Sequence, residues 1–251
     1  MTIVLAALDS SAAARPVLET AISVAAITGS TVRAVHVRED GHEVPAALAR
    51  AREVPLRELE GPVEEGLLHE LGADEVIIGV IGARGTPAGA RPVGHIALHV
   101  VERVAKPVVV VPPEALEVPA RPTRLLVPLE GTEACAEPVV ALLQPLLADD
   151  VDLVVVHVLT ATTAPPMVDH PDWGLEHWSA EFLARHLPDA ADLRIRTGPV
   201  GAEILQAAAD AAVDAIVLCW SQDASPGHAA VVRTVLEHAP MPIFLLPAGP
   251  R

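Results

Sequence analysis

The stretch PVVVVP, residues 107–112, has a counterpart in PIFLLP at residues 242–247, an offset of 135. Each is a short apolar run closed by prolines, which is typical of a strand buried on both faces of a parallel sheet. A second motif, VHV, occupies residues 35–37 and again 156–158, an offset of 121. Motifs that repeat in the same order predict two copies of one unit joined head to tail.

Apolar strands alternate with helices in both copies. Ser10 and Ser11 offer an N-cap for a helix that runs to about Thr28 and stops at Gly29, and a later helix is expected over Gly94–Ala105. The expected strands are Thr2–Leu8, Thr31–Val37, Pro55–Leu59, Val76–Ile81 and Pro107–Val111 in the first copy, then Arg124–Leu129, Val151–Val158, Asp192–Thr197, Ala215–Leu218 and Pro242–Leu246 in the second.

This alternation predicts an α/β fold of two tandem, doubly wound, five-stranded parallel sheets of the Rossmann-like type, because parallel strands need crossover helices on both faces. We expect one domain over residues 1–115 and a second over 122–251, with the Pro-rich stretch 112–122 between them. The second copy carries about 16 extra residues between its second and third strands, in the region Thr160–Arg185.

The composition suits such sheets and excludes several classes of partner. Apolar residues make up 51% of the 251 residues, aromatic residues only 2%, and the mean hydropathy is +0.41. The net charge is −16 and Lys106 is the only lysine, so we expect no binding to nucleic acid or to anionic membranes, which needs clustered cations. A phosphate site must therefore use backbone N–H groups, a helix N-terminus or a metal ion. The chain begins without a basic segment, and no apolar run nears the roughly 20 residues that span a bilayer, which predicts a cytoplasmic protein.

Ligands of doubly wound sheets bind beyond the carboxyl ends of the strands, where the strand order reverses. In the first copy this rule brings together Asp9, after the first strand, and the segment GARG at 82–85, after the fourth. A stretch containing several glycines then leads to a helix that begins near His95. Glycines beside a helix N-terminus permit close backbone approach to a phosphate, although such loops also serve as plain turns.

The residues around this crevice resemble the universal stress protein family, and the resemblance extends over nearly the whole chain. It is carried by ALDS at 7–10, VHV at 35–37, GARG at 82–85, Gly94-His95, and KPVVVVP at 106–112. ATP-binding members show the pattern G-x-x-G-x9-G-S/T after the fourth strand. The resemblance implies that ATP or a related adenine nucleotide, with or without Mg²⁺, is held by Ala7, Leu8, Asp9, Val37, Gly82, Arg84, Gly85, Gly94 and His95. Asp9 and Val37 would hold the adenine and ribose, and the glycines would hold the ribose and phosphates.

The two copies depart from that pattern to different degrees. In the first, eight residues instead of nine separate Gly85 from Gly94, and His95 replaces the hydroxyl residue. A histidine can still donate a hydrogen bond to phosphate. In the second copy, Glu130 stands in the place of Asp9 and CWSQ at 219–222 replaces GARG. We therefore expect the nucleotide in the first copy and a degenerate site in the second, with Trp220 filling space.

The resemblance also implies how the copies associate, since family members dimerise through their fifth strands. Residues 107–111 and 242–246 would then pair within one chain as an intramolecular pseudo-dimer, and a homodimer is a further possibility. The leading hypothesis is a stress-responsive adenine-nucleotide-binding module. A scaffold that binds proteins without nucleotide is the alternative, and a weak ATPase is third, since no nucleophile–base pair or P-loop is evident.

Three further groups of residues have two interpretations. His95 and His99 share a helix face at the spacing of a zinc pair, but no third ligand follows them in sequence. The insertion contains a cluster of possible metal ligands: Asp169, His170, Asp172, Glu176 and His177. They fit either a divalent metal site or a solvated acidic loop that is packed down by Trp173, Trp178 and Phe182. The insertion would then cover the crevice of the second copy as a lid or as a plug, and the aromatic residues favour a plug. Cys135 and Cys219 are far apart in sequence, and we expect them to be reduced thiols, with Cys219 either buried and inert or a redox sensor.

Overall fold

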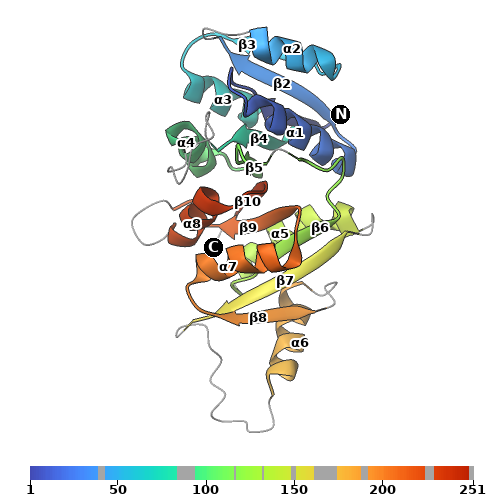
Figure 1. Ribbon diagram of the computed structural model, residues 1–251, viewed down its shortest axis with the longest axis vertical. Coiled ribbons are helices and arrows are strands. Elements are labelled where there is room, and N and C mark those ends of the chain that lie inside the picture. Colours follow the sequence, from blue (N-terminus) through green and yellow to red (C-terminus); the bar gives the residue numbers. More distant parts are fainter. Residues whose placement is uncertain are drawn as a thin grey trace.

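The computed structural model describes residues 1–38, 43–83, 94–115, 117–131, 133–147, 151–160, 174–187, 192–223 and 229–248. Within these residues the strands form a single ten-stranded sheet in the order β3-β2-β1-β4-β5-β10-β9-β6-β7-β8 (Figure 1). Its N-terminal half consists of β1 (Ile3–Ala7), β2 (Thr31–Val37), β3 (Leu56–Leu59), β4 (Val76–Gly82) and β5 (Val108–Val111). Its C-terminal half consists of β6 (Arg124–Pro128), β7 (Asp152–Leu159), β8 (Leu193–Thr197), β9 (Ala215–Trp220) and β10 (Ile243–Pro247). All ten expected strands are therefore present, with no end shifted by more than two residues.

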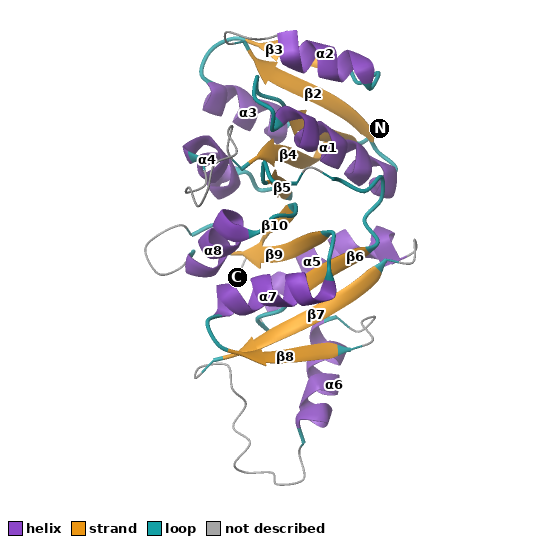
Figure 2. Ribbon diagram, in the orientation of Figure 1, coloured by secondary structure: helices purple, strands orange, loops and turns teal. Residues whose placement is uncertain are grey.

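Helices cover both faces of the sheet (Figure 2). Those packed on one face are α3 (Val63–Gly72), α4 (His95–Arg103), α7 (Val200–Ala211) and α8 (Ala230–His238). Those on the other face are α1 (Ala14–Thr28), α2 (Glu43–Ala51), α5 (Glu133–Leu147) and α6 (Leu175–His186). Among the described helices none is long and apolar enough to cross a lipid bilayer.

The prediction for the start of the first helix was wrong by several residues, whereas its end was correct. α1 begins at Ala14, and its N-cap residue Ala13 makes no side-chain capping bond. Ser11 instead closes a turn, because its N–H and hydroxyl both donate to Asp9 Oδ1, at 3.0 and 2.7 Å. At the other end Gly29 takes the left-handed conformation (φ 62°) and its N–H donates to Ala25 O, as a C-cap glycine does.

The two halves of the sheet meet at β5 and β10, which pair antiparallel, whereas every other neighbouring pair is parallel. Val109 lies opposite Phe244 in this pair, and Val110 opposite Ile243. Alternate residues of β5 and β10 enter opposite cores, so each core runs without interruption from one half into the other. The pairing of the fifth strands within one chain, expected from the resemblance, is confirmed.

Glutamine 222 adds a polar contact between the halves. It follows β9 with φ of 58°, in the left-handed region. Its side-chain amide donates to the carbonyl oxygens of Val101 and Val104, both at 2.8 Å, and so caps the carboxyl end of α4 in the other half. The corresponding place in the first copy belongs to Gly85, which lies outside the described residues.

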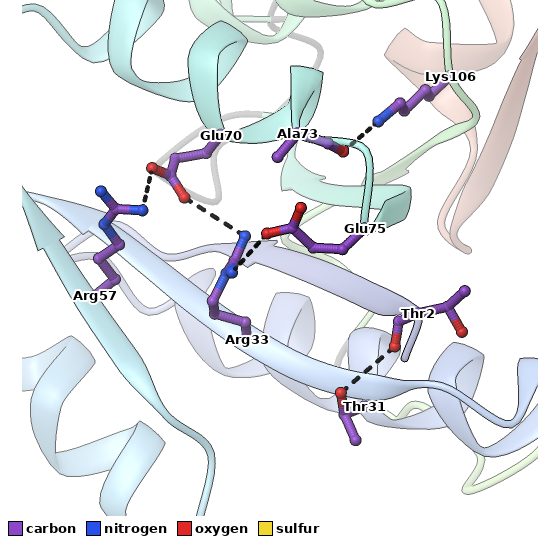
Figure 3. Close-up of polar contacts among 8 residues, drawn as sticks. All are labelled: Thr2, Thr31, Arg33, Arg57, Glu70, Ala73, Glu75 and Lys106. Atoms are coloured by element: carbon purple, nitrogen blue, oxygen red, sulfur yellow. Dashed lines mark hydrogen bonds and ion pairs between the residues drawn. The ribbon is translucent and has the colours of Figure 1, made fainter.

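A network of ion pairs ties α3 to the sheet in the N-terminal half (Figure 3). Glu70, on α3, is only 2% exposed and pairs with Arg57 at 2.8 Å and with Arg33 at 3.6 Å. Arg33 also donates to Glu75 at 3.2 Å. Lys106 donates to the carbonyl oxygen of Ala73 at 2.5 Å. The pKa of the Glu75 carboxyl lies below its usual range, first because of a hydrogen bond from its own backbone N–H and then because of Arg33.

The close contact of α7 and α8 leads to a first prediction. A Cβ placed on Gly201 would lie 2.8 Å from both Cβ and Cγ2 of Thr234. Because a Cβ cannot swing away, Gly201→Ala must push the helices apart, and we expect it to lower the free energy of unfolding by about 1–3 kcal/mol in urea denaturation. The control is Gly72→Ala, where nothing lies within 4 Å, and it should change stability by less than about 1 kcal/mol. Equal stability of the two variants would contradict the tight packing.

The Arg33 network leads to a second prediction, on pH. Because the pKa of Glu75 is lowered in the folded state, its pairing adds stability above the unfolded pKa, and this is lost as the pH falls through the folded pKa. Arg33→Met should therefore destabilise the protein more at pH 7 than below about pH 3. The pKa of Glu75 measured by NMR should rise in the same variant. In a Glu75→Gln background the Arg33 substitution should lose much of its pH dependence, and an unchanged dependence would contradict the assignment.

Candidate functional site

A cavity of about 420 Å³ lies at the carboxyl ends of β1, β2 and β4. This volume is in the range of sites for small molecules. Seven of the nine residues predicted for a nucleotide line this cavity: Ala7, Leu8, Asp9, Val37, Gly82, Gly94 and His95. The other two, Arg84 and Gly85, lie outside the described residues. We call this space the N-terminal cavity.

The acidic side of the N-terminal cavity is built by the turn that follows β1. Asp9 is exposed, and both hydrogen bonds from Ser11 go to its Oδ1 atom. The carboxylate is therefore held in one orientation at the cavity wall, where it can accept hydrogen bonds from a ligand hydroxyl. Val17, Val35, Leu67 and Ile81 make the walls apolar.

His36 is a residue of the cavity whose role the sequence analysis did not assign. Its ring is 2% exposed, and Nδ1 donates to the carbonyl oxygen of Leu8 at 2.9 Å. This bond fastens the end of β2 to the end of β1. His157 makes the same bond to Leu129 O at 2.7 Å in the other half. A histidine between two valines near the end of a strand, repeated at the same place in both copies, is the signal that could have identified this role.

The start of α4 forms the opposite side of the N-terminal cavity. Gly94 donates its N–H to Ala83 O at 2.8 Å, and α4 begins at the next residue without a side-chain cap. The N–H groups of the first turn of a helix have no partner within the helix, and they carry the positive end of its dipole. An anionic group of a ligand would be stabilised there.

The two histidines considered as a zinc pair contact Glu64 instead. Its carboxylate lies 3.2 Å from His95 Nε2 and 3.4 Å from His99 Nε2. The guanidinium of Arg103 contacts the ring of His99, and its charge would repel a metal ion. The described residues contain no group of three or more His, Cys, Asp or Glu side chains able to hold a metal. Of the second metal hypothesis, Asp169, His170 and Asp172 lie outside the described residues.

A second cavity, of about 390 Å³, lies at the carboxyl ends of β6, β7 and β9 and is called the C-terminal cavity. Glu130, His157 and Trp220 line it, as expected from the repeat. Cys135 and Cys219 also line it, and they form a disulfide with a Cα–Cα distance of 5.5 Å. The expectation of two reduced thiols was therefore wrong. A sequence separation of 84 concealed the proximity of the cysteines, which arises because α5 packs beside β9.

The described part of the insertion packs against the C-terminal cavity. The rings of Trp178 and Phe182, on α6, lie 5.4 and 4.8 Å from the ring of His157 between centroids. A Cβ on Gly131 would come within 2.8 Å of the Phe182 ring, so only glycine fits at that position beneath α6. Neither ring is among the residues that line the cavity, so the described part of α6 packs beside it and does not fill it as a plug would, and Trp173 lies outside the described residues.

Comparisons with known proteins agree with this arrangement. The model of the universal stress protein family matches residues 122–247, the half in which we expected the more altered site. A functionally unknown protein from Pseudomonas aeruginosa PAO1 superposes at a TM-score of 0.71 with 12% identity, covering 99% of this chain and 93% of that chain. A putative universal stress protein from Pseudomonas aeruginosa UCBPP-PA14 gives 0.71 with 14% identity, covering 99% and 94%.

A universal stress protein from Archaeoglobus fulgidus DSM 4304 superposes at a TM-score of 0.69 with 14% identity, covering 98% of both chains. At these identities the likeness establishes the fold alone. A search of curated protein sequences found no match. Because the family model covers half of the chain and the fold agrees over its whole length, the chain belongs to the universal stress protein family.

Proposed function

We propose that the chain is a stress-responsive, cytoplasmic module that binds an adenine nucleotide such as ATP in its N-terminal cavity. It would consist of two domains, residues 1–115 and 122–251, the second serving as the intramolecular partner of the first. The observation that carries the proposal is that seven of the nine predicted residues, from four segments of the chain, line one cavity at the carboxyl ends of β1, β2 and β4. This is where ligands of doubly wound sheets bind.

The apolar walls of the cavity suit a planar base with a sugar attached. Val17, Leu67 and Ile81 offer aliphatic surface to the faces of a base. The Asp9 carboxylate, fixed by Ser11, offers an acceptor to ribose hydroxyls. A cavity of about 420 Å³ is large enough for the nucleoside part, so the phosphates would lie at its open side.

The start of α4 suits the phosphates. Its uncapped first turn supplies backbone N–H donors, and the His95 side chain, 83% exposed, supplies a ring donor. Glu64, beside His95, adds negative charge to this edge. Mg²⁺ bound to the phosphates would offset that charge, and Asp9 is the carboxylate of the cavity wall that could join its coordination.

The third prediction tests the nucleotide and its place. Titration calorimetry of the full chain with ATP should show binding, and Asp9→Ala should weaken it by about tenfold to a hundredfold, the cost of a lost hydrogen bond to a charged group. The matched control is Glu130→Ala, the same change at the corresponding position of the other half, and it should leave the affinity unchanged. Circular dichroism should show that both variants fold.

Two outcomes would overturn the proposal. Wild-type protein that binds no adenine nucleotide, and that releases none when heat-denatured after purification, would favour the scaffold alternative. A loss of binding in Glu130→Ala, and not in Asp9→Ala, would place the nucleotide in the C-terminal cavity. Release of inorganic phosphate from bound ATP would instead add the ATPase activity that we do not propose.

A further inference from the structure

The disulfide lies at the point where the two halves differ most. Leu246 pairs with Cys219 in the C-terminal half, as Val111 pairs with Gly82 in the N-terminal half. Cys219 therefore takes the place of Gly82, a residue of the N-terminal cavity wall. Cys135, near the start of α5, is bonded to it. The disulfide thus joins the end of β9 to the start of α5. The corresponding place in the N-terminal half is the wall of the N-terminal cavity at Gly82.

The C-terminal cavity gives a reagent a route to this bond. Both cysteines line the cavity, whose volume of about 390 Å³ can admit a small thiol. Cys219 is partly exposed, whereas Cys135 is 6% exposed. We therefore expect a nucleophile that enters the cavity to attack Cys219, the more exposed residue of the two. Disulfides that are accessible in the folded state are the labile or regulatory ones.

The carboxylate of Glu130 lies where it can accept a hydrogen bond from Cys135 in the reduced protein. Its Oε1 atom lies 3.6 Å from the sulfur of Cys135. Once the bond is broken and the two sulfurs have moved apart, the thiol of Cys135 can donate a hydrogen bond to this nearby carboxylate.

We propose that Cys135–Cys219 is a thiol–disulfide exchange site, whose co-reactant is a dithiol, and that its reduction frees the start of α5. The dithiol attacks Cys219 as a thiolate, a mixed disulfide forms, and Cys135 leaves with the bond electrons and takes up a proton. The second thiol of the reagent then attacks the mixed disulfide and releases Cys219. The protein gains two electrons and two protons, and the dithiol becomes a disulfide.

The contacts that remain after reduction limit the change to one segment. α5 also packs against α1, β9 and β10, and its residues Val139 and Leu143 are fully buried. These contacts hold the body of the helix when the bond at its start is broken. The expected result is a local opening beside the C-terminal cavity, without unfolding of the sheet.

The fourth prediction uses the two single variants as controls for each other. In Cys135→Ser only Cys219 can react, and in Cys219→Ser only Cys135 can. We expect Cys219 to react with an aromatic disulfide reagent at least about tenfold faster than Cys135, because exposure governs the rate. If either variant fails to fold, the relative reaction rates of Cys219 and Cys135 are measured on the reduced wild-type protein by pulsed alkylation and mass spectrometry of the peptides.

Two further measurements on the oxidised full chain complete the test. Dithiothreitol should reduce the bond much faster than the protein unfolds, with circular dichroism unchanged. Hydrogen exchange should then accelerate at the start of α5 but not in α7, and the double variant Cys135→Ser/Cys219→Ser should match the reduced protein. Reduction no faster than unfolding, a faster reaction at Cys135, or unchanged exchange would each overturn the proposal and leave the bond a structural crosslink.

Discussion

The antiparallel pairing of β5 with β10 is the interaction on which the rest of the structure depends. Each strand is wholly apolar between its prolines, and each would be an exposed edge if the other were absent. Because side chains alternate along a strand, Val108 and Val110 enter one core and Val109 and Val111 the other. The β5–β10 pairing therefore joins the hydrophobic cores on both faces of the sheet, and the two halves share these cores as well as the sheet.

The shared framework carries two different cavities. In each half a buried histidine fastens the second strand to the first through the same hydrogen bond, so the carboxyl ends of the strands are held alike. What differs is the surrounding chemistry. The N-terminal cavity has a fixed carboxylate and an uncapped helix start, whereas the C-terminal cavity has a disulfide and the aromatic rings of α6 beside it. The side chain of Gln222, after β9, donates a hydrogen bond to α4 of the other half, so the segment that follows β9 contributes to the association of the halves.

Much of the fold and of the N-terminal site followed from local patterns. Apolar runs predict buried strands, and the rule for the carboxyl ends of parallel strands correctly predicts that Asp9 and Gly82 lie at one cavity. The start of α1 was placed too early because Ser11, although its Oγ accepts a hydrogen bond from the N–H of Ala13 at 3.1 Å, lies in a turn with Asp9 that precedes the helix. Glu64 was missed because it comes from α3, far in sequence from the histidines it contacts.

The sequence by itself determined the duplication and the ten strands, because apolar runs and their order are local properties of the chain. The pairing of the fifth strands and most residues of the N-terminal cavity were predicted from the resemblance of short motifs to a known family. The tertiary structure alone decided the partners of Glu70, the Gln222 cap and the disulfide between Cys135 and Cys219. Each joins residues from different elements, and such proximity depends on how helices pack on the sheet, which no local pattern encodes.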